Sequence, residues 1–346
     1  MKKTTKTAWI VVSIVVSSLL VLIMGFLSVY FLWPWNKDFF DMAKEEFAIP
    51  GLRDNFVPQG LTAVGDTGNF LVSGYMTDKS PSRIYYVNGK TNEVIKYVTL
   101  KMSDSEADYI GHAGGIAFYG DSVWVSGDGY IHRLLFSDIN RADNAEKIYM
   151  KAYMKTGNGA DFVYAINETL WVGEFYKEKK YETSEEHHLK TTSGETNRAV
   201  AYGFVIDEGR NIGLQYKSYD EIVPTRALSL PDLVQGMTFS SDGKILLSTS
   251  WSLSDSVLKL YRNVFENEAQ GTVKYGYYTI DLWYLDDNSL VSDTRIPSMS
   301  EEIVSKNDIV YVLFESGCKK YKLVNRVSLK QAYSFPINSL RNYKNV

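Results

Sequence analysis

The sequence predicts an all-β fold of repeated units that follows a single membrane-spanning helix. Three observations lead to this prediction: a short motif that recurs along the chain, an abundance of tyrosine (25) and tryptophan (7), and an uncharged N-terminal run. Aromatic residues favour pleated, half-buried surfaces, and helical periodicity is nearly absent after the N-terminal run. Four short strands in each unit of about 40 to 50 residues are typical of a β-propeller blade.

The N-terminal apolar run is long enough to span a bilayer. No charged residue occurs from Ala8 to Trp33, and at about 1.5 Å per residue a helix of this length crosses a hydrocarbon core of about 30 Å. Lysines precede the run and predict a cytoplasmic N-terminus, while residues 31–40 offer no signal-peptidase site, which favours an uncleaved anchor. We therefore predict a cytoplasmic basic tip (1–7), a transmembrane anchor (8–33), a linker (34–44) and an extracytoplasmic propeller domain (45–346).

Five segments share one pattern: a doublet of small, amide or acidic residues, an apolar residue, a polar turn and a second apolar strand. They cover residues 58–76, 114–129, 160–176, 235–251 and 301–317. The glycine-rich stretch "GHAGG" (111–115) belongs to the second copy and precedes a strand. Because a phosphate-binding glycine loop opens a helix instead, we interpret this stretch as part of the repeat.

Each copy is followed by further strand candidates. Third strands are expected at 82–88, 130–136, 199–206, 256–262 and 318–324, and fourth strands at 93–100 and 147–154. We predict five blades, with a sixth, degenerate blade within 252–300 as the alternative. A propeller closes when its last blade meets its first, and either residues 40–50 or residues 331–337 could supply the closing strand. Two polar insertions, 177–197 and 263–276, are expected to be loops.

The doublets should meet in space, because the innermost strand of every propeller blade lines the central channel. The doublets are Gln59-Gly60, Gly114-Gly115, Ala160-Asp161, Gln235-Gly236 and Glu301-Glu302. A second layer of acids follows at the ends of the next strands. The candidate ligand-binding residues are therefore Gln59, His112, Asp161, Glu174, Gln235, Glu302 and Glu315.

Four of these candidates are acids that a cation could hold together: Asp161, Glu174, Glu302 and Glu315. Oxygen-rich sites suit Ca²⁺ or Mg²⁺, so either ion is the predicted cofactor if the acids bind metal. The alternative is structural, with the acids fixing turns or Glu302 pairing with a lysine or arginine. His112 is a weak candidate for a general base, against a structural role.

Other side chains carry weaker signals. Tyr75, Tyr176 and Trp251 follow the second strands and could stack on a sugar or peptide, although packing between blades is the commoner use of aromatic residues. His187 and His188 lie in a charged stretch and are expected in a solvated loop.

The repeat resembles the bacterial exported β-propellers of the broad regucalcin, gluconolactonase and lactonase-like kind. The resemblance rests on the segments "PQGLTAV", "VQGMTFSSDGKILLSTS" and "EEIVSKNDIVYVLFESG". Metal-dependent members of that group hold a divalent cation at the channel mouth with acidic and amide side chains, so the resemblance implies a similar site. It concerns the fold, and propellers perform many functions.

The composition and the missing motifs exclude several classes of function. A net charge of −4 and a pI near 5.7 give no basic surface for nucleic acid. One cysteine, Cys318, rules out an intramolecular disulfide, and serine-hydrolase, zinc-protease, Walker and C-x-x-C motifs are missing from the sequence. We expect a ligand-binding or protein-interaction module at the cell surface, with a small molecule, a glycan or a surface protein as partner. The alternative is a metal-dependent hydrolase or lyase of a small ester, lactone or glycan.

Overall fold

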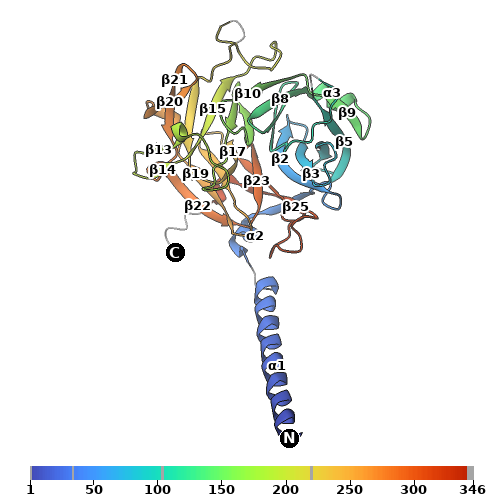
Figure 1. Cartoon of the computed structure of the whole chain (residues 1–346). Coiled ribbons are helices and arrows are strands. Elements are labelled where there is room, and N and C mark those ends of the chain that lie inside the picture. The colour runs from blue at the N-terminus through green and yellow to red at the C-terminus, as the bar shows by residue number, and fades with distance from the viewer. Residues whose placement is uncertain (1, 33–34, 103–104, 219–220, 341–346) are drawn as a thin grey trace. The chain divides into compact units, whose positions relative to one another are not determined.

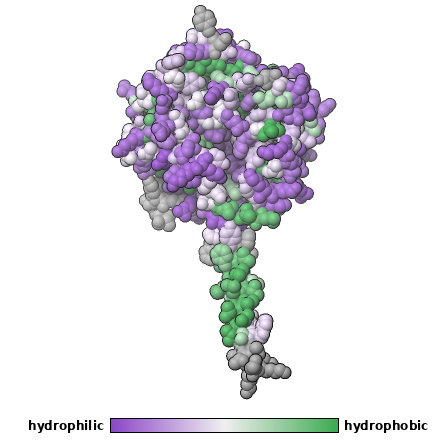
Figure 2. Space-filling view, in the orientation of Figure 1, coloured by the Kyte–Doolittle hydropathy of each residue, from purple (hydrophilic) through white to green (hydrophobic). Residues whose placement is uncertain are grey.

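The computed structural model describes residues 2–32, 35–102, 105–218 and 221–340, and the chain divides into two compact units, Met1–Lys37 and Asp38–Val346. The first unit consists of α1 (Lys2–Leu32), whose segment Ala8–Tyr30 is long and apolar enough to cross a membrane and has no buried residue. Figure 2 shows the apolar covering of this helix. Such a helix indicates secretion or membrane anchoring. The side chains of the predicted basic tip, the last residue of the predicted anchor (33) and the first residue of the predicted linker (34) lie outside the described residues.

The second unit is a five-bladed β-propeller, as predicted (Figure 1). Blade 1 contains β2 (Phe56–Val64), β3 (Asn69–Met76), β4 (Arg83–Asn88) and β5 (Glu93–Lys101), and blade 2 contains β6 (Gly115–Tyr119), β7 (Ser122–Gly127), β8 (Tyr130–Leu135) and β10 (Ala152–Lys155). Blade 3 contains β11 (Phe162–Ile166), β12 (Thr169–Gly173), β15 (Ala199–Val205) and β16 (Arg226–Leu230). Blade 4 contains β17 (Val234–Phe239), β18 (Ile245–Thr249), β19 (Ser256–Tyr261) and β22 (Leu290–Ile296).

Blade 5 joins the two ends of the propeller. It contains β23 (Ser300–Lys306), β24 (Ile309–Phe314), β25 (Gln331–Pro336) and, as its outer strand, β1 (Lys44–Ala48), which pairs antiparallel with β25. Both segments that could supply the closing strand, residues 40–50 and residues 331–337, therefore contribute a strand to blade 5. Just before β1, the short helix α2 (Lys37–Met42) buries Phe39 against the aromatic rings of blade 5.

The prediction of a third strand at 318–324 is wrong. This segment forms consecutive turns, in which the amides of Tyr321 and Lys322 both donate to the carbonyl of Cys318. Its apolar residues do not face a core, since Leu323 is 82% exposed. The third strand of blade 5 is β25 instead.

Additional strands enlarge two blades. In blade 1, β9 (Glu146–Tyr149) lies parallel to β5, and in blade 3 the hairpin β20 (Gly271–Tyr275) and β21 (Tyr278–Tyr284) extends the sheet beyond β16. The insertion 263–276 is therefore not only a loop: its alternating apolar residues, such as Val273, are buried against blade 3. The rest of 252–300 belongs to blade 4, so the alternative of a sixth blade fails.

Short elements complete the unit. They are α3 (Phe136–Arg141), the 3₁₀ turns η1 (Glu185–His187), η2 (Val264–Glu266) and η3 (Ile337–Ser339), and the two-residue strands β13 (Leu189–Lys190) and β14 (Thr196–Asn197).

Glycines allow the innermost strands to approach one another. A Cβ on Gly60 would lie 2.7 Å from the amide nitrogen of Ile116, and a Cβ on Gly115 would lie 2.7 Å from that of Val163. Gly236 is equally close to Glu302 of the next blade. The second residue of each of these doublets is therefore glycine because the backbone of the neighbouring blade occupies the space of a side chain.

The register of blade 3 corrects one doublet. Gly60 and Gly115 pair with Ser73 and Ser126, whereas the corresponding pair in blade 3 is Phe162 with Gly173. The doublet of blade 3 is thus Asp161-Phe162 and not Ala160-Asp161. The ring of Phe162 lies over Gly173, so in blade 3 the glycine of this pair belongs to the second strand, β12.

We expect Gly115→Ala to lower the free energy of unfolding by about 1–3 kcal/mol, because the added methyl group overpacks the contact between blades 2 and 3. Gly209→Ala is the matched control, since its Cβ would meet only the side chain of Asp207 at 3.2 Å. Urea unfolding of the detergent-solubilised chain, followed by circular dichroism, measures both. Equal stability of the two variants would contradict the close approach of the strands.

Candidate functional site

The first residues of the five doublets meet at one end of the channel. They are Gln59, Gly114, Asp161, Gln235 and Glu301, and all five line a cavity of about 540 Å³. A volume of about 300–1,000 Å³ is usual for a small-molecule site. Because the innermost strands run in the same direction, equivalent positions in each blade point to the same mouth.

Five of the seven predicted ligand-binding residues line this cavity, namely Gln59, His112, Asp161, Gln235 and Glu315. The other two, Glu174 and Glu302, are buried beside it and bind backbone amides. The cavity also contains Glu301, which the sequence analysis placed in a doublet without selecting it.

We call the polar side chains that the innermost strands and the residues just before them contribute to the cavity its floor. On one side of the floor, polar side chains from blades 5, 1 and 2 contact one another in a chain. Glu301 and Glu315 are hydrogen-bonded to each other. The amide of Gln59 donates to Glu315 Oε2 at 3.1 Å, and its carbonyl oxygen contacts His112 Nε2 closely. The ring of His112 stacks on Tyr75 with centroids 4.7 Å apart. The network thus connects an acid pair to the rim.

Burial disfavours the ionised form of both acids. Burial, together with the charges of Glu315 and Glu302, raises the pKa of Glu301 well above its usual range. Burial also raises the pKa of Glu315 to about 7, against the opposing effect of Lys320. Near neutral pH the pair therefore holds at least one proton.

Asp161 occupies the equivalent position in blade 3. Its Oδ2 accepts a 2.7 Å hydrogen bond from the amide of Phe175. Burial, with smaller contributions from Glu174 and Asp128, raises the pKa of Asp161 to about 7. Perturbed carboxyl groups in a cavity are typical of functional sites.

Two aromatic walls rise from this floor. One consists of Tyr75 and Tyr321, and the ammonium of Lys320 lies 5.3 and 4.7 Å from the centroids of the two rings. The other consists of Phe175, Tyr181 and Trp251, whose ring centroids are 5.6 to 6.1 Å apart. Lys180 lies 4.7 Å from the centroid of Trp251. The cavity therefore offers flat apolar faces above polar groups.

Sequence reasoning identified only part of these walls. Tyr75 and Trp251 line the cavity, but Tyr176 is 3% exposed and packs against Arg198 and His188. The wall residues Lys180, Tyr181, Lys320 and Tyr321 come from the two loops that follow the second strands of blades 3 and 5. In both loops a lysine directly precedes a tyrosine in the sequence, and this pattern could have indicated the walls. The repeat does not align the two loops with each other.

Glu302 links blade 5 to blades 1 and 2 by hydrogen bonds. Its Oε2 accepts hydrogen bonds from the amides of Leu61 (2.8 Å) and Ile116 (2.9 Å), which belong to the innermost strands of blades 1 and 2. The expected pairing with lysine or arginine is not found among the ion pairs of the described residues. Burial raises the pKa of Glu302 well above its usual range, although these amides oppose the effect.

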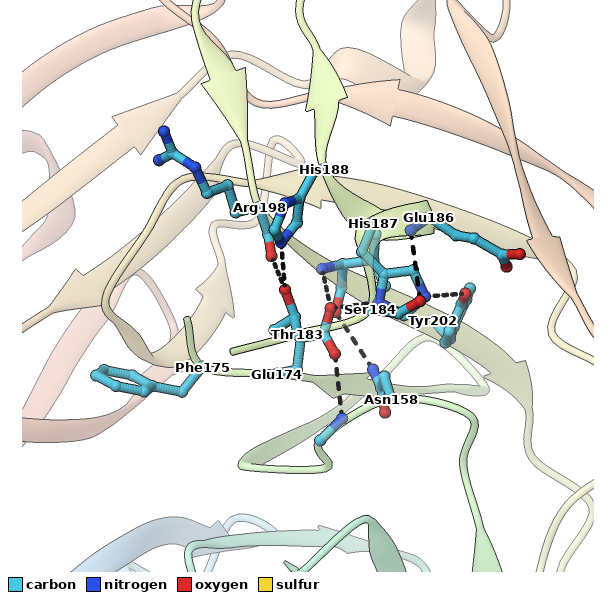
Figure 3. Close-up of polar contacts among 12 residues, drawn as sticks. Asn158, Glu174, Phe175, Thr183, Ser184, Glu186, His187, His188, Arg198 and Tyr202 are labelled. Carbon is cyan, nitrogen blue, oxygen red and sulfur yellow. Dashed lines mark hydrogen bonds and ion pairs between the residues drawn. The ribbon is translucent and has the colours of Figure 1, made fainter. Parts of the chain in front are cut away.

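Glu174 holds the insertion 177–197 through polar contacts (Figure 3). It is not among the residues that line the cavity. Its Oε1 contacts His187 Nδ1 at 2.6 Å and accepts from the amide of Val200 at 3.0 Å. His187 Nε2 lies 3.2 Å from the hydroxyl of Tyr202. His187 is 4% exposed, so the prediction of a solvated histidine is wrong for this residue. The pair fixes the loop that carries Lys180 and Tyr181.

The four predicted metal ligands do not form one cluster. Glu174 and Glu302 direct oxygens to backbone amides, and Glu315 pairs with Glu301. Within the described parts of the chain, no three His, Cys, Asp or Glu side chains are arranged to hold a metal ion. A Ca²⁺ or Mg²⁺ site stays a prediction that this geometry does not favour.

No protein-family model and no curated protein matches the chain. Several solved structures share the architecture. Aldose sugar dehydrogenase from Streptomyces coelicolor, in its PQQ-bound form, is 11% identical, with a TM-score of 0.48 over 85% of this chain and 97% of that one. BamB from Moraxella catarrhalis is 9% identical, with a TM-score of 0.33 over 80% of this chain and 82% of that one.

Kuenenia stuttgartiensis hydrazine synthase is 12% identical, with a TM-score of 0.38; the match covers 76% of this chain and 58% of that one. Such likenesses concern the propeller fold alone. The chain thus has a β-propeller fold that resembles diverse propellers, and no family is assigned.

We expect the stability of the wild-type protein to fall relative to that of Asp161→Asn as pH rises from 5 to 8. Between its unfolded value near 3.8 and about 7, Asp161 binds more protons in the folded state. The stability that it contributes at low pH is therefore lost as pH rises through 7. The difference in unfolding free energy should change by about 1.4 kcal/mol or more, the equivalent of one pKa unit.

Urea unfolding at pH 5, 6.5 and 8 measures this difference. Asp66→Asn serves as control, because the side chain of Asp66 is fully exposed beside Lys306. A pH-independent difference for Asp161→Asn would show that Asp161 is ionised throughout.

We expect Glu174→Ala to destabilise the protein by about 3–5 kcal/mol, because it leaves His187 and two backbone amides without their buried acceptor. Limited proteolysis should cut the variant faster within 177–197. Glu178→Ala, which removes an exposed acid of the same loop, should change stability by less than about 0.5 kcal/mol. Equal effects of the two substitutions would rule out the anchoring role.

Proposed function

We propose that the protein is a membrane-anchored, extracytoplasmic propeller that binds carbohydrate at its channel mouth. The supporting observation is the cavity of about 540 Å³, whose amide and acid floor lies between two aromatic walls. A sugar ring combines apolar C–H faces with hydroxyl groups along its edge. The faces can pack on aromatic rings, and the hydroxyl groups can exchange hydrogen bonds with carboxyl and amide groups.

The charge of the floor also suits a polyhydroxylated ligand. The carboxyl groups of Asp161 and Glu315 have pKa values of about 7, because burial disfavours their ionised form. A protonated carboxyl group both donates and accepts hydrogen bonds, as does a hydroxyl group. The side chain of Gln235, which also lines the cavity, adds an amide donor and acceptor.

Anchoring and orientation rest on the N-terminal helix. The segment Ala8–Tyr30 is long enough to span a bilayer. Lysines precede it in the sequence, which favours a cytoplasmic N-terminus and an extracytoplasmic propeller. A cell-surface glycan would then be within reach of the cavity.

Binding is favoured over the metal-dependent hydrolysis that the sequence also suggested. Such a reaction needs oxygen ligands that converge on one ion. Both oxygens of Glu174 and the Oε2 of Glu302 accept hydrogen bonds from backbone amides instead. His112, the weak candidate for a general base, contacts Gln59 and stacks on Tyr75.

We expect Trp251→Ala to weaken oligosaccharide binding by roughly tenfold, which corresponds to about 1.4 kcal/mol. The substitution removes one face of an aromatic wall. The detergent-solubilised chain is applied to an array of immobilised oligosaccharides, and the glycans that it retains are titrated by calorimetry. Tyr277→Ala is the matched control, because Tyr277 is a fully exposed aromatic residue that does not line the cavity. Failure of the wild-type chain to bind any glycan would refute the proposal.

A further inference from the structure

The acid pair of blade 5 has no cation of its own. Glu301 lines the cavity, yet it is only 5% exposed. It is hydrogen-bonded to Glu315, another acid. Across the described residues, neither acid forms an ion pair with a lysine, arginine or histidine. A buried acid without a cationic partner is costly, since buried charges are normally paired.

The nearest basic group is already engaged. The ammonium of Lys320 attracts Glu315, but it donates a 2.7 Å hydrogen bond to the hydroxyl of Tyr75. It also lies 4.7 Å from the ring centroid of Tyr321. The other ionisable group acting on the pair from within blade 5 is Glu302, whose charge repels Glu301.

These contacts leave a place for a ligand cation. Two carboxyl groups at hydrogen-bonding distance repel each other when both are ionised, so the pair keeps a proton near neutral pH, and a cation beside the pair can replace that proton. An ammonium group offers three donors and no acceptor, and it is also attracted to aromatic faces. Lys320 shows that an ammonium group fits against Tyr75 and Tyr321.

Building on the carbohydrate-binding function, we propose that Glu301 and Glu315 recognise a free amino group, so that the preferred ligand is an amino sugar whose nitrogen is not acetylated. The amide of Gln59, which donates to Glu315, holds that carboxylate toward the cavity. An acetylated nitrogen carries no charge and presents one donor, so it cannot take the place of the proton that the pair holds.

Two trimers that differ only in acetylation test this proposal. Isothermal titration calorimetry of the full-length, detergent-solubilised chain at pH 7 compares the glucosamine trimer with the N-acetylglucosamine trimer, in buffer containing EDTA. The glucosamine trimer should bind at least about tenfold more tightly. In Glu301→Gln and Glu315→Gln the preference should fall below about threefold, while affinity for the acetylated trimer changes less than about twofold.

The controls separate this inference from the function on which it rests. Glu178→Gln, an exposed substitution outside the cavity, should keep the full preference. Thermal unfolding confirms that each variant is folded. Equal affinity of the wild-type chain for both trimers, or a preference that survives both substitutions in the pair, overturns the inference and leaves carbohydrate binding intact. Binding of neither trimer, with no glycan retained on the array, overturns both.

Discussion

The propeller depends on how closely its innermost strands approach the channel axis. Glycines at positions 60, 115 and 236 let neighbouring backbones come within a distance that no side chain would allow. The carboxyl group of Glu302 then reaches from blade 5 to the amides of Leu61 and Ile116 in blades 1 and 2. A buried acid that accepts hydrogen bonds from several strands is tolerated because these amides would otherwise lack partners.

This construction determines where a ligand can be held. The innermost strands approach one another closely at these glycines, and the first residue of each doublet lines the cavity at one end of the channel. The walls are added by loops of blades 3 and 5. Each loop is fixed by its own contacts: Glu174 and His187 hold the first, and turns at Cys318 shape the second. The rigid ring thus supplies the floor, while the loops determine which ligand shape fits.

The fold and the floor could be predicted from the sequence, because both follow from the repeat. Five segments with the same pattern of doublet, polar turn and second strand indicated five blades, and equivalent positions had to meet at one mouth. The walls could not be predicted in this way. Lys320 and Tyr321 lie in a segment whose apolar residues suggest a strand, and only its turns reveal otherwise. His187 lies among acids and lysines, yet its contact with Glu174, 13 residues earlier, buries it. Such contacts depend on tertiary structure, which local composition does not encode.

The charges of the cavity are distributed unevenly, and this asymmetry bears on its chemistry. Lys180 and Lys320 lie over aromatic rings of the walls. Asp161, Glu301 and Glu315 lie in the floor, where burial raises the pKa of these three acids. A purely structural mouth would be expected to pair these opposite charges directly, because an unpaired buried acid lowers stability. Proteins accept such a cost at sites where a ligand completes the interactions. The separation of lysines from acids therefore favours a cavity that is built to be filled.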